Sequence, residues 1–96
     1  MEKPIKIWAL LRKKQKIVAD VVLEFVRPDD EQSWQETIGA LSTALQQSRP
    51  VLLSKHFDQL EQFRRTIFYP SDFVETVDFD KMEIELFPEK TEKQTK

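Results

Sequence analysis

The chain has 96 residues, a net charge of −2 at neutral pH, a hydrophobic fraction of 40% and an aromatic fraction of 10%. This length and composition predict one small domain with a real core, and they exclude two independent cores or disorder of the whole chain. The sequence holds no cysteine, one histidine and one glycine. These counts exclude a thiolate metal centre, a histidine-rich metal site and a glycine-rich phosphate loop.

The termini and charge balance indicate the compartment and the class of partner. The apolar stretch near the start is short and contains Lys6, unlike an export signal, and no run approaches the ~18 apolar residues of a membrane span. The near balance of charges gives no overall attraction to nucleic acid or anionic lipid. We therefore expect a cytoplasmic protein with no cofactor.

The first two elements are predicted to be the strands of a β-hairpin. Residues 4–12 are apolar on both sides of a two-residue alternation, which is typical of a central strand. Residues 17–25 follow with a β-branched run that has the same period. The turn between them contains neither Gly nor Asn-Gly, which predicts a loop of three to five residues rather than a tight turn.

A long helix is predicted next. Ser33 and Glu36 match a capping box, and an alternative cap at Asp29 or Asp30 would lengthen the helix by one turn. Arg49-Pro50 is expected to end it. The apolar stripe that should pack on the sheet consists of Trp34, Ile38, Leu41 and Leu45.

The second half of the domain predicts shorter elements. Residues 51–53 are either a third strand or a buried connector, and Ser54 is a candidate cap for a short helix. That helix should bury Phe57, Leu60 and Phe63. Strands are predicted at 65–69 and 82–87, with a single helical turn or loop at 71–73. The sequence therefore predicts one α+β domain over 1–87, with a mostly antiparallel sheet of three or four strands, a long helix on one face and a disordered tail at 88–96.

Charge segregation predicts how the ends of the domain meet. Residues 1–16 carry six basic side chains and one acidic, whereas residues 72–85 carry six acidic and one basic. Opposite charges on paired strands attract, which predicts that the last strand lies beside the first. Lys6 would then lie within reach of Glu83 or Glu85. The alternative is two independently solvated segments, because exposed ion pairs contribute little.

Three polar clusters are candidate sites. His56, Arg64 and Arg65 could form an anion-binding patch on the second helix, although a solvated surface histidine and arginines are the more common outcome. The basic hairpin tip could contact nucleic-acid phosphates, with Trp8 stacking a base, although basic tips more often serve solubility. Its cations are Arg12, Lys13, Lys14 and Lys16. The acidic residues Asp72, Glu75, Asp78 and Asp80 match no EF-hand spacing and are interpreted as a solvated loop, not a metal site.

The second face of the hairpin is the better candidate for binding. Its apolar side chains are Trp8, Leu10, Val18 and Val22, and the long helix cannot cover this face and the other one together. The short helix is the expected cover. A partner protein or a second copy of the chain is the alternative, because exposed apolar patches often mark interaction sites.

Several segments together resemble a group of short uncharacterised bacterial proteins. They are Ile5-Lys6-Ile7-Trp8, residues 50–56, residues 63–68 and residues 79–84. The resemblance implies a bacterial cytoplasmic protein and indicates no functional residue. We expect a non-enzymatic protein-interaction or regulatory module, monomeric or weakly dimeric, with a nucleic-acid accessory protein as the alternative.

Overall fold

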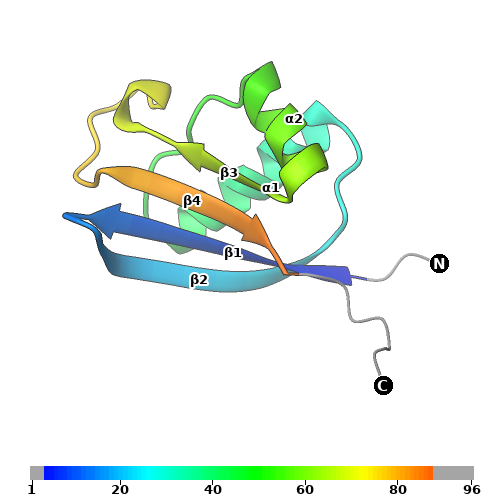
Figure 1. Cartoon of the computed structure of the whole chain (residues 1–96), viewed down its shortest axis with the longest axis horizontal. Helices are drawn as coiled ribbons and strands as arrows, with labels where there is room; N and C mark the ends of the chain where they lie inside the picture. The colour runs from blue at the N-terminus through cyan, green and yellow to red at the C-terminus, as the bar shows by residue number, and fades with distance from the viewer. Residues whose placement is uncertain (1–3, 88–96) are drawn as a thin grey trace.

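The computed structural model describes residues 4–87 and confirms the α+β class, with a four-stranded antiparallel sheet and two helices. The sheet has the order β2-β1-β4-β3. In Figure 1, α1 lies behind the sheet and α2 lies beside β3. The tail predicted at 88–96 lies outside the described residues. The elements are β1 (Pro4–Lys13), β2 (Lys16–Val26), α1 (Glu31–Ala44), α2 (Ser54–Phe63), β3 (Arg65–Phe68), the 3-10 turn η1 (Pro70–Asp72) and β4 (Lys81–Leu86).

β1 is a central strand, as its two apolar sides predict. It pairs with β2 on one side and with β4 on the other, and both pairs are antiparallel. The charge segregation therefore predicted the long-range neighbour correctly. The core-facing side chains of β1 are Ile5, Ile7, Ala9 and Leu11, and all are buried. They meet Met82, Ile84 and Leu86 of β4 in one apolar cluster.

The turn of the hairpin is tighter than the sequence predicts. Only Lys14 and Gln15 separate β1 from β2, and their φ angles are 55° and 69°. Two consecutive positive φ values are the mark of a type I′ turn, which matches the twist of the flanking strands. The expectation of a longer loop was wrong because extensive strand pairing imposes this turn on residues that do not favour it. The Lys14 N–H also donates to Asp80 Oδ2 at 2.7 Å.

Helix α1 begins at one of the alternative predicted caps, one turn before Ser33. Asp30 is the N-cap, and its carboxylate accepts the Ser33 N–H at 2.8 Å, which lowers the pKa of Asp30. The helix ends before Arg49-Pro50, because Gln46 takes a left-handed φ of 61°. The predicted stripe is buried: Trp34, Ile38, Leu41 and Leu45 all belong to the core.

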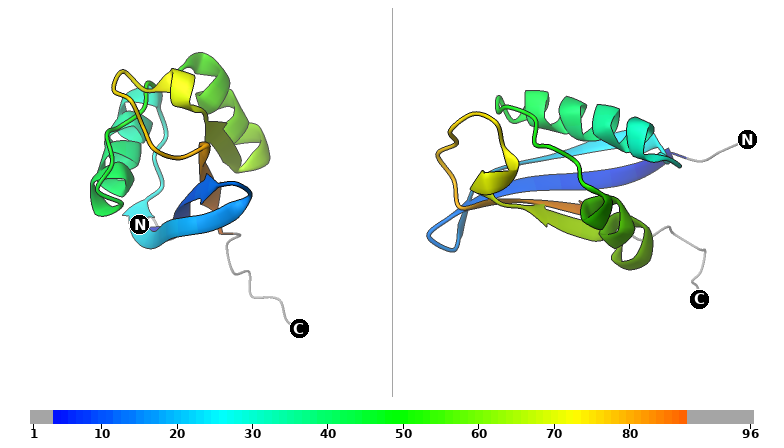
Figure 2. Two further views of the ribbon diagram at one scale, coloured as in Figure 1. Left: turned by 90° about the vertical axis from the view of Figure 1, so that its left-hand side faces the viewer. Right: turned by 90° about the horizontal axis from the view of Figure 1, so that it is seen from above.

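Helix α2 is shorter and lies along β3. Residues 51–53, which precede it, form a connector rather than a strand. Leu60 is buried and Phe57 is half-buried, as predicted, but Phe63 is 65% exposed. Phe63 is the last residue of α2, and Arg64 then takes a left-handed φ of 62° that turns the chain into β3. This turn leaves Phe63 outside the core. Figure 2 shows α1 over one face of the sheet and α2 at its β3 edge.

Candidate functional site

The face of the sheet opposite α1 carries a tryptophan between two strands. Trp8 lies opposite Val22 of β2 and Glu85 of β4 in the strand register. Its indole Nε1 donates to Asp20 Oδ2 at 2.9 Å, and its ring lies 6.5 Å from that of Phe87. These contacts fix the ring on the surface of the sheet. We call this surface the open face; it includes Lys6, Trp8, Leu10, Arg12, Asp20, Val22, Glu24, Glu83 and Glu85.

Of the four apolar residues predicted on this face, Trp8, Leu10 and Val22 share it, Val18 lies beside it at a bulge in β2, and the four differ in exposure. Leu10 is 1% exposed and Trp8 is half-buried. Val18 and Val22 are 54% and 43% exposed. The expectation that the short helix covers them was wrong. α2 packs on β3, and the strand order places β3 at the opposite edge from β2.

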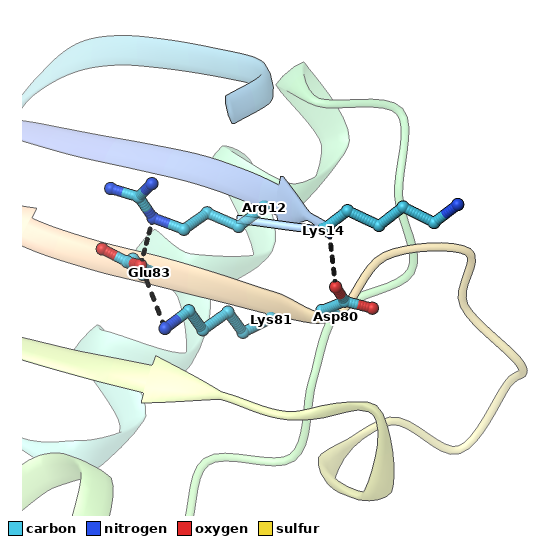
Figure 3. A network of polar contacts seen from close by, with 5 residues as sticks. All are labelled: Arg12, Lys14, Asp80, Lys81 and Glu83. Atoms are coloured by element: carbon cyan, nitrogen blue, oxygen red, sulfur yellow. Dashed lines mark hydrogen bonds and ion pairs between the residues drawn. The ribbon is translucent and has the colours of Figure 1, made fainter. Parts of the chain in front are cut away.

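Two cations of the hairpin tip pair with carboxylates of the acidic segment and of β4. Arg12 Nε donates to Glu83 Oε2 at 2.6 Å, and Lys81 Nζ lies 3.7 Å from the same oxygen (Figure 3). Lys13 pairs with Asp78 at 3.1 Å. Two of the four cations proposed to contact nucleic acid therefore already have carboxylate partners, which weakens that interpretation. Lys14 and Lys16 form no ion pair with residues 4–87.

The predicted partner of the β4 carboxylates was wrong in detail. The register places Lys6 beyond Glu85, opposite the end of β4, where the Phe87 N–H donates to the Lys6 carbonyl at 3.0 Å. Arg12, at the other end of β1, forms the ion pair with Glu83 instead. The segregation of charge identified the paired strands, but the register decided which cation meets which carboxylate.

The acidic loop has structural partners. Asp72 accepts the Tyr69 N–H, Glu75 accepts the Ser48 hydroxyl, and Asp80 accepts the Lys14 N–H. Within residues 4–87, no group of three or more His, Cys, Asp or Glu side chains is arranged to hold a metal ion.

His56 is a structural residue of the α2 N-terminus. It is fully buried, and its ring stacks on Phe68 with 4.3 Å between centroids. Nδ1 accepts the Leu53 N–H at 3.0 Å, which satisfies a backbone donor before the first turn. Nε2 lies 3.6 Å from Asp72 Oδ2. Burial lowers the pKa of His56, and Asp72 opposes that effect. Nδ1 must be unprotonated to accept, so this histidine is held neutral.

The anion site expected from His56, Arg64 and Arg65 is not formed. His56 lies in the first turn of α2, whereas Arg64 caps its other end, eight residues and about 12 Å of helix rise away. Arg65 begins β3 and is exposed. The histidine faces the core while the arginines face solvent, so the three side chains do not converge on one ligand.

Helix α2 also borders a groove along β3. The groove has a volume of about 560 Å³ and is lined on the helix side by Lys55, Gln59 and Phe63. Gln59 accepts the Thr66 hydroxyl at 2.5 Å, which ties the helix to the strand across this groove. In Figure 2, α2 stands where a further strand would continue the sheet beyond β3. We therefore interpret α2 as the cover of this edge.

The other edge of the sheet is formed by β2, whose importance the sequence analysis missed. No residue of this 11-residue strand is fully buried. Asp20 and Glu24 alternate with Val22 along the open face. The signal was present in the sequence, because the predicted pairing of the last strand with the first leaves the second strand at the edge.

Comparisons with known proteins provide no further assignment: no protein-family model, curated protein or solved structure matches the chain. Among residues 4–87, no helix is long and apolar enough to cross a membrane. The site is therefore defined by its own geometry, which consists of the open face and the uncovered edge next to it.

Proposed function

We propose that the protein is a non-enzymatic interaction module that binds another protein through the open face next to β2. The observation that carries the proposal is the position of Val18 and Val22. Both are β-branched and remain exposed within residues 4–87, and Val22 lies directly opposite Trp8 in the strand register. Apolar surface at an unpaired sheet edge is the kind of surface that a partner can bury on binding.

The polar chemistry of the chain supports a binding role over an enzymatic one. The single histidine is buried and accepts a backbone hydrogen bond, so it is not free to move protons for a substrate. The ion pairs of Arg12 and Lys13 count against the nucleic-acid alternative. A protein partner is therefore the function that this geometry supports best.

Capture from a lysate of the encoding organism tests the proposal. The full chain is used as bait beside Val22→Asp, which places a charge in the middle of the apolar surface. Ala40→Asp, on the exposed side of α1, is the matched control. We expect the wild type and Ala40→Asp to retain the same partner, and Val22→Asp to lose it by at least about tenfold, since one buried charge costs more than 1.4 kcal/mol.

The folding of each bait is checked by circular dichroism, because a misfolded variant would lose binding trivially. Hydrogen exchange of the complex then locates the contact. Protection of β2 amides supports the proposal, whereas a partner retained equally by all three baits contradicts it.

A further inference from the structure

The hydrogen-bonding pattern of β1 identifies which backbone groups of β2 are free. The Lys6 carbonyl accepts from Phe87 N–H, and the Arg12 carbonyl accepts from Asp80 N–H at 2.8 Å. Even-numbered residues of β1 therefore direct their backbone groups towards β4. In an antiparallel pair these directions alternate, so the residues of β2 opposite them point away from β1. These residues are Asp20, Val22 and Glu24.

The side chains at these three positions form a simple pattern on the open face. A carboxylate, an exposed valine and a second carboxylate follow each other at every second residue. Lys6 of β1 lies opposite Glu24, but no cation of β2 joins these side chains on the open face. A bulge at Val18 shifts the register, so Lys16 lies opposite Lys13 and on the other face of the sheet. On this face β2 itself therefore contributes only negative charge.

From this pattern we propose that the partner adds a β-strand with basic side chains to the free edge of β2. The inference rests on the proposed function and specifies the chemistry of its partner. Strand addition uses the outward backbone groups for affinity and alternate side chains for specificity. The best complement has Lys or Arg opposite Asp20 and Glu24, with an apolar residue opposite Val22. Opposite-charge pairs across strands are favourable, and like-charge pairs are unfavourable.

A second copy of the chain is a poorer occupant of this edge. Two antiparallel copies of β2 centred on Val22 place Asp20 directly opposite Glu24 twice, and copies centred on Asp20 place the two Asp20 side chains opposite each other. Copies centred on Val21 avoid direct opposition but leave the carboxylates of both chains as diagonal neighbours. No register brings a cation of β2 to the open face. The edge therefore favours a partner with a different sequence.

A titration with a short synthetic strand tests the proposal. The probe is Ac-Lys-Thr-Val-Thr-Lys-NH2, whose lysines have the spacing of Asp20 and Glu24. Its control, Ac-Thr-Lys-Val-Lys-Thr-NH2, has the same composition but directs both lysines to the other face. We expect downfield shifts of the Asp20, Val22 and Glu24 amides of the 15N-labelled chain, with the control peptide bound at least about threefold more weakly. The titration extends to about 5 mM peptide, which detects even a Kd near 1 mM.

Two variants separate strand addition from other contacts. Val22→Pro removes an N–H that points outward and so leaves the β1–β2 ladder intact, whereas Val22→Thr keeps that N–H. We expect Val22→Pro to raise the Kd of the probe peptide by at least about tenfold. The Kd for Val22→Thr should stay within about threefold of the wild-type value. Should Val22→Pro fail to fold, Glu24→Lys provides the test. This variant should bind the lysine probe peptide more weakly than the wild type does, and it should bind Ac-Glu-Thr-Val-Thr-Glu-NH2 more tightly.

The outcomes also distinguish this inference from the proposed function. If Val22→Asp loses the captured partner but Val22→Pro keeps it, the partner binds the open face without adding a strand. That result overturns strand addition but leaves the proposed function intact. Equal binding of both lysine peptides, shifts confined to other residues, or no shift at all also overturns strand addition. In sedimentation we expect a monomer for the wild type and association for Glu24→Lys, in which Lys can face Asp20 of a second copy. A wild-type dimer that Val22→Pro abolishes would identify a second copy as the occupant.

Discussion

The two edges of this sheet differ in how well they are protected from pairing with another strand. β3 has four residues, and α2 lies along it, with the Leu60 side chain in the core and Gln59 bonded to Thr66. β2 has 11 residues and no helix along its edge within the described range, and its apolar pattern is interrupted by Lys16 at its start, a bulge and two carboxylates. Short strands, covering helices, bulges and charges are all ways in which proteins protect an edge. Here the strongest protection is at β3, so binding is expected at β2.

The largest expected effect is a loss of stability caused by a substitution at the covered edge. Leu60→Ala removes a fully buried side chain of α2, and we expect the free energy of unfolding to fall by about 2–5 kcal/mol. Val22→Ala at the open edge should cost less than about 1 kcal/mol, because much of that side chain is already in water. Urea denaturation of both variants measures the contrast. Equal losses would mean that the open edge is as important for stability as the covered one.

Stability should also depend on pH through His56 of α2, the helix at the covered edge. Burial lowers the pKa of His56, so below about 6.5 the unfolded chain takes up a proton that the folded protein does not. The free energy of unfolding should therefore fall as the pH drops below about 6.5, by at most about 1.4 kcal/mol per pH unit, until the folded pKa is reached.

His56→Gln is the control for this pH dependence. It should be less stable than the wild type at neutral pH, since it loses the stacking on Phe68, but its stability should change less between about pH 6.5 and 5.5. Urea denaturation at several pH values gives both curves. Parallel curves for the two proteins would show that His56 does not cause the dependence.

The smallest effect concerns the hairpin that carries the open edge. Gln15 is held at a φ of 69°, where glycine has no steric cost. Gln15→Gly should raise the free energy of unfolding by about 1 kcal/mol, and Gln15→Ala should give no such gain. Thermal denaturation compares the two. A loss of stability in Gln15→Gly would show that the flexibility gained by the unfolded chain outweighs the relief in the turn.

The sequence predicted what depends on local periodicity and on gross charge. The strand and helix segments, the Trp34 stripe, the Asp30 cap as an alternative and the pairing of the last strand with the first all follow from patterns within a few residues or from segment charge. The register of β4 against β1 was beyond such reasoning. It depends on the packing of the whole core, and it moved the ion pair from Lys6 to Arg12.

The candidate site was predicted less well than the fold. Trp8, Leu10, Val18 and Val22 were assigned to one face by their spacing; the register places Trp8, Leu10 and Val22 there, whereas Val18 lies at the bulge. Their lack of a cover could not be predicted, because helix periodicity does not say which strand a helix packs on. His56 was misread for the same reason: its spacing to Arg64 is helical, but only tertiary packing turns it towards Phe68.

The loop before β4 is fastened to the hairpin tip at two points, through the Asp80 N–H to the Arg12 carbonyl and through the Asp80 carboxylate to the Lys14 N–H. The hydrogen–deuterium exchange rate of the Lys14 amide, measured from one NMR signal, therefore reports how often this end of the molecule opens locally.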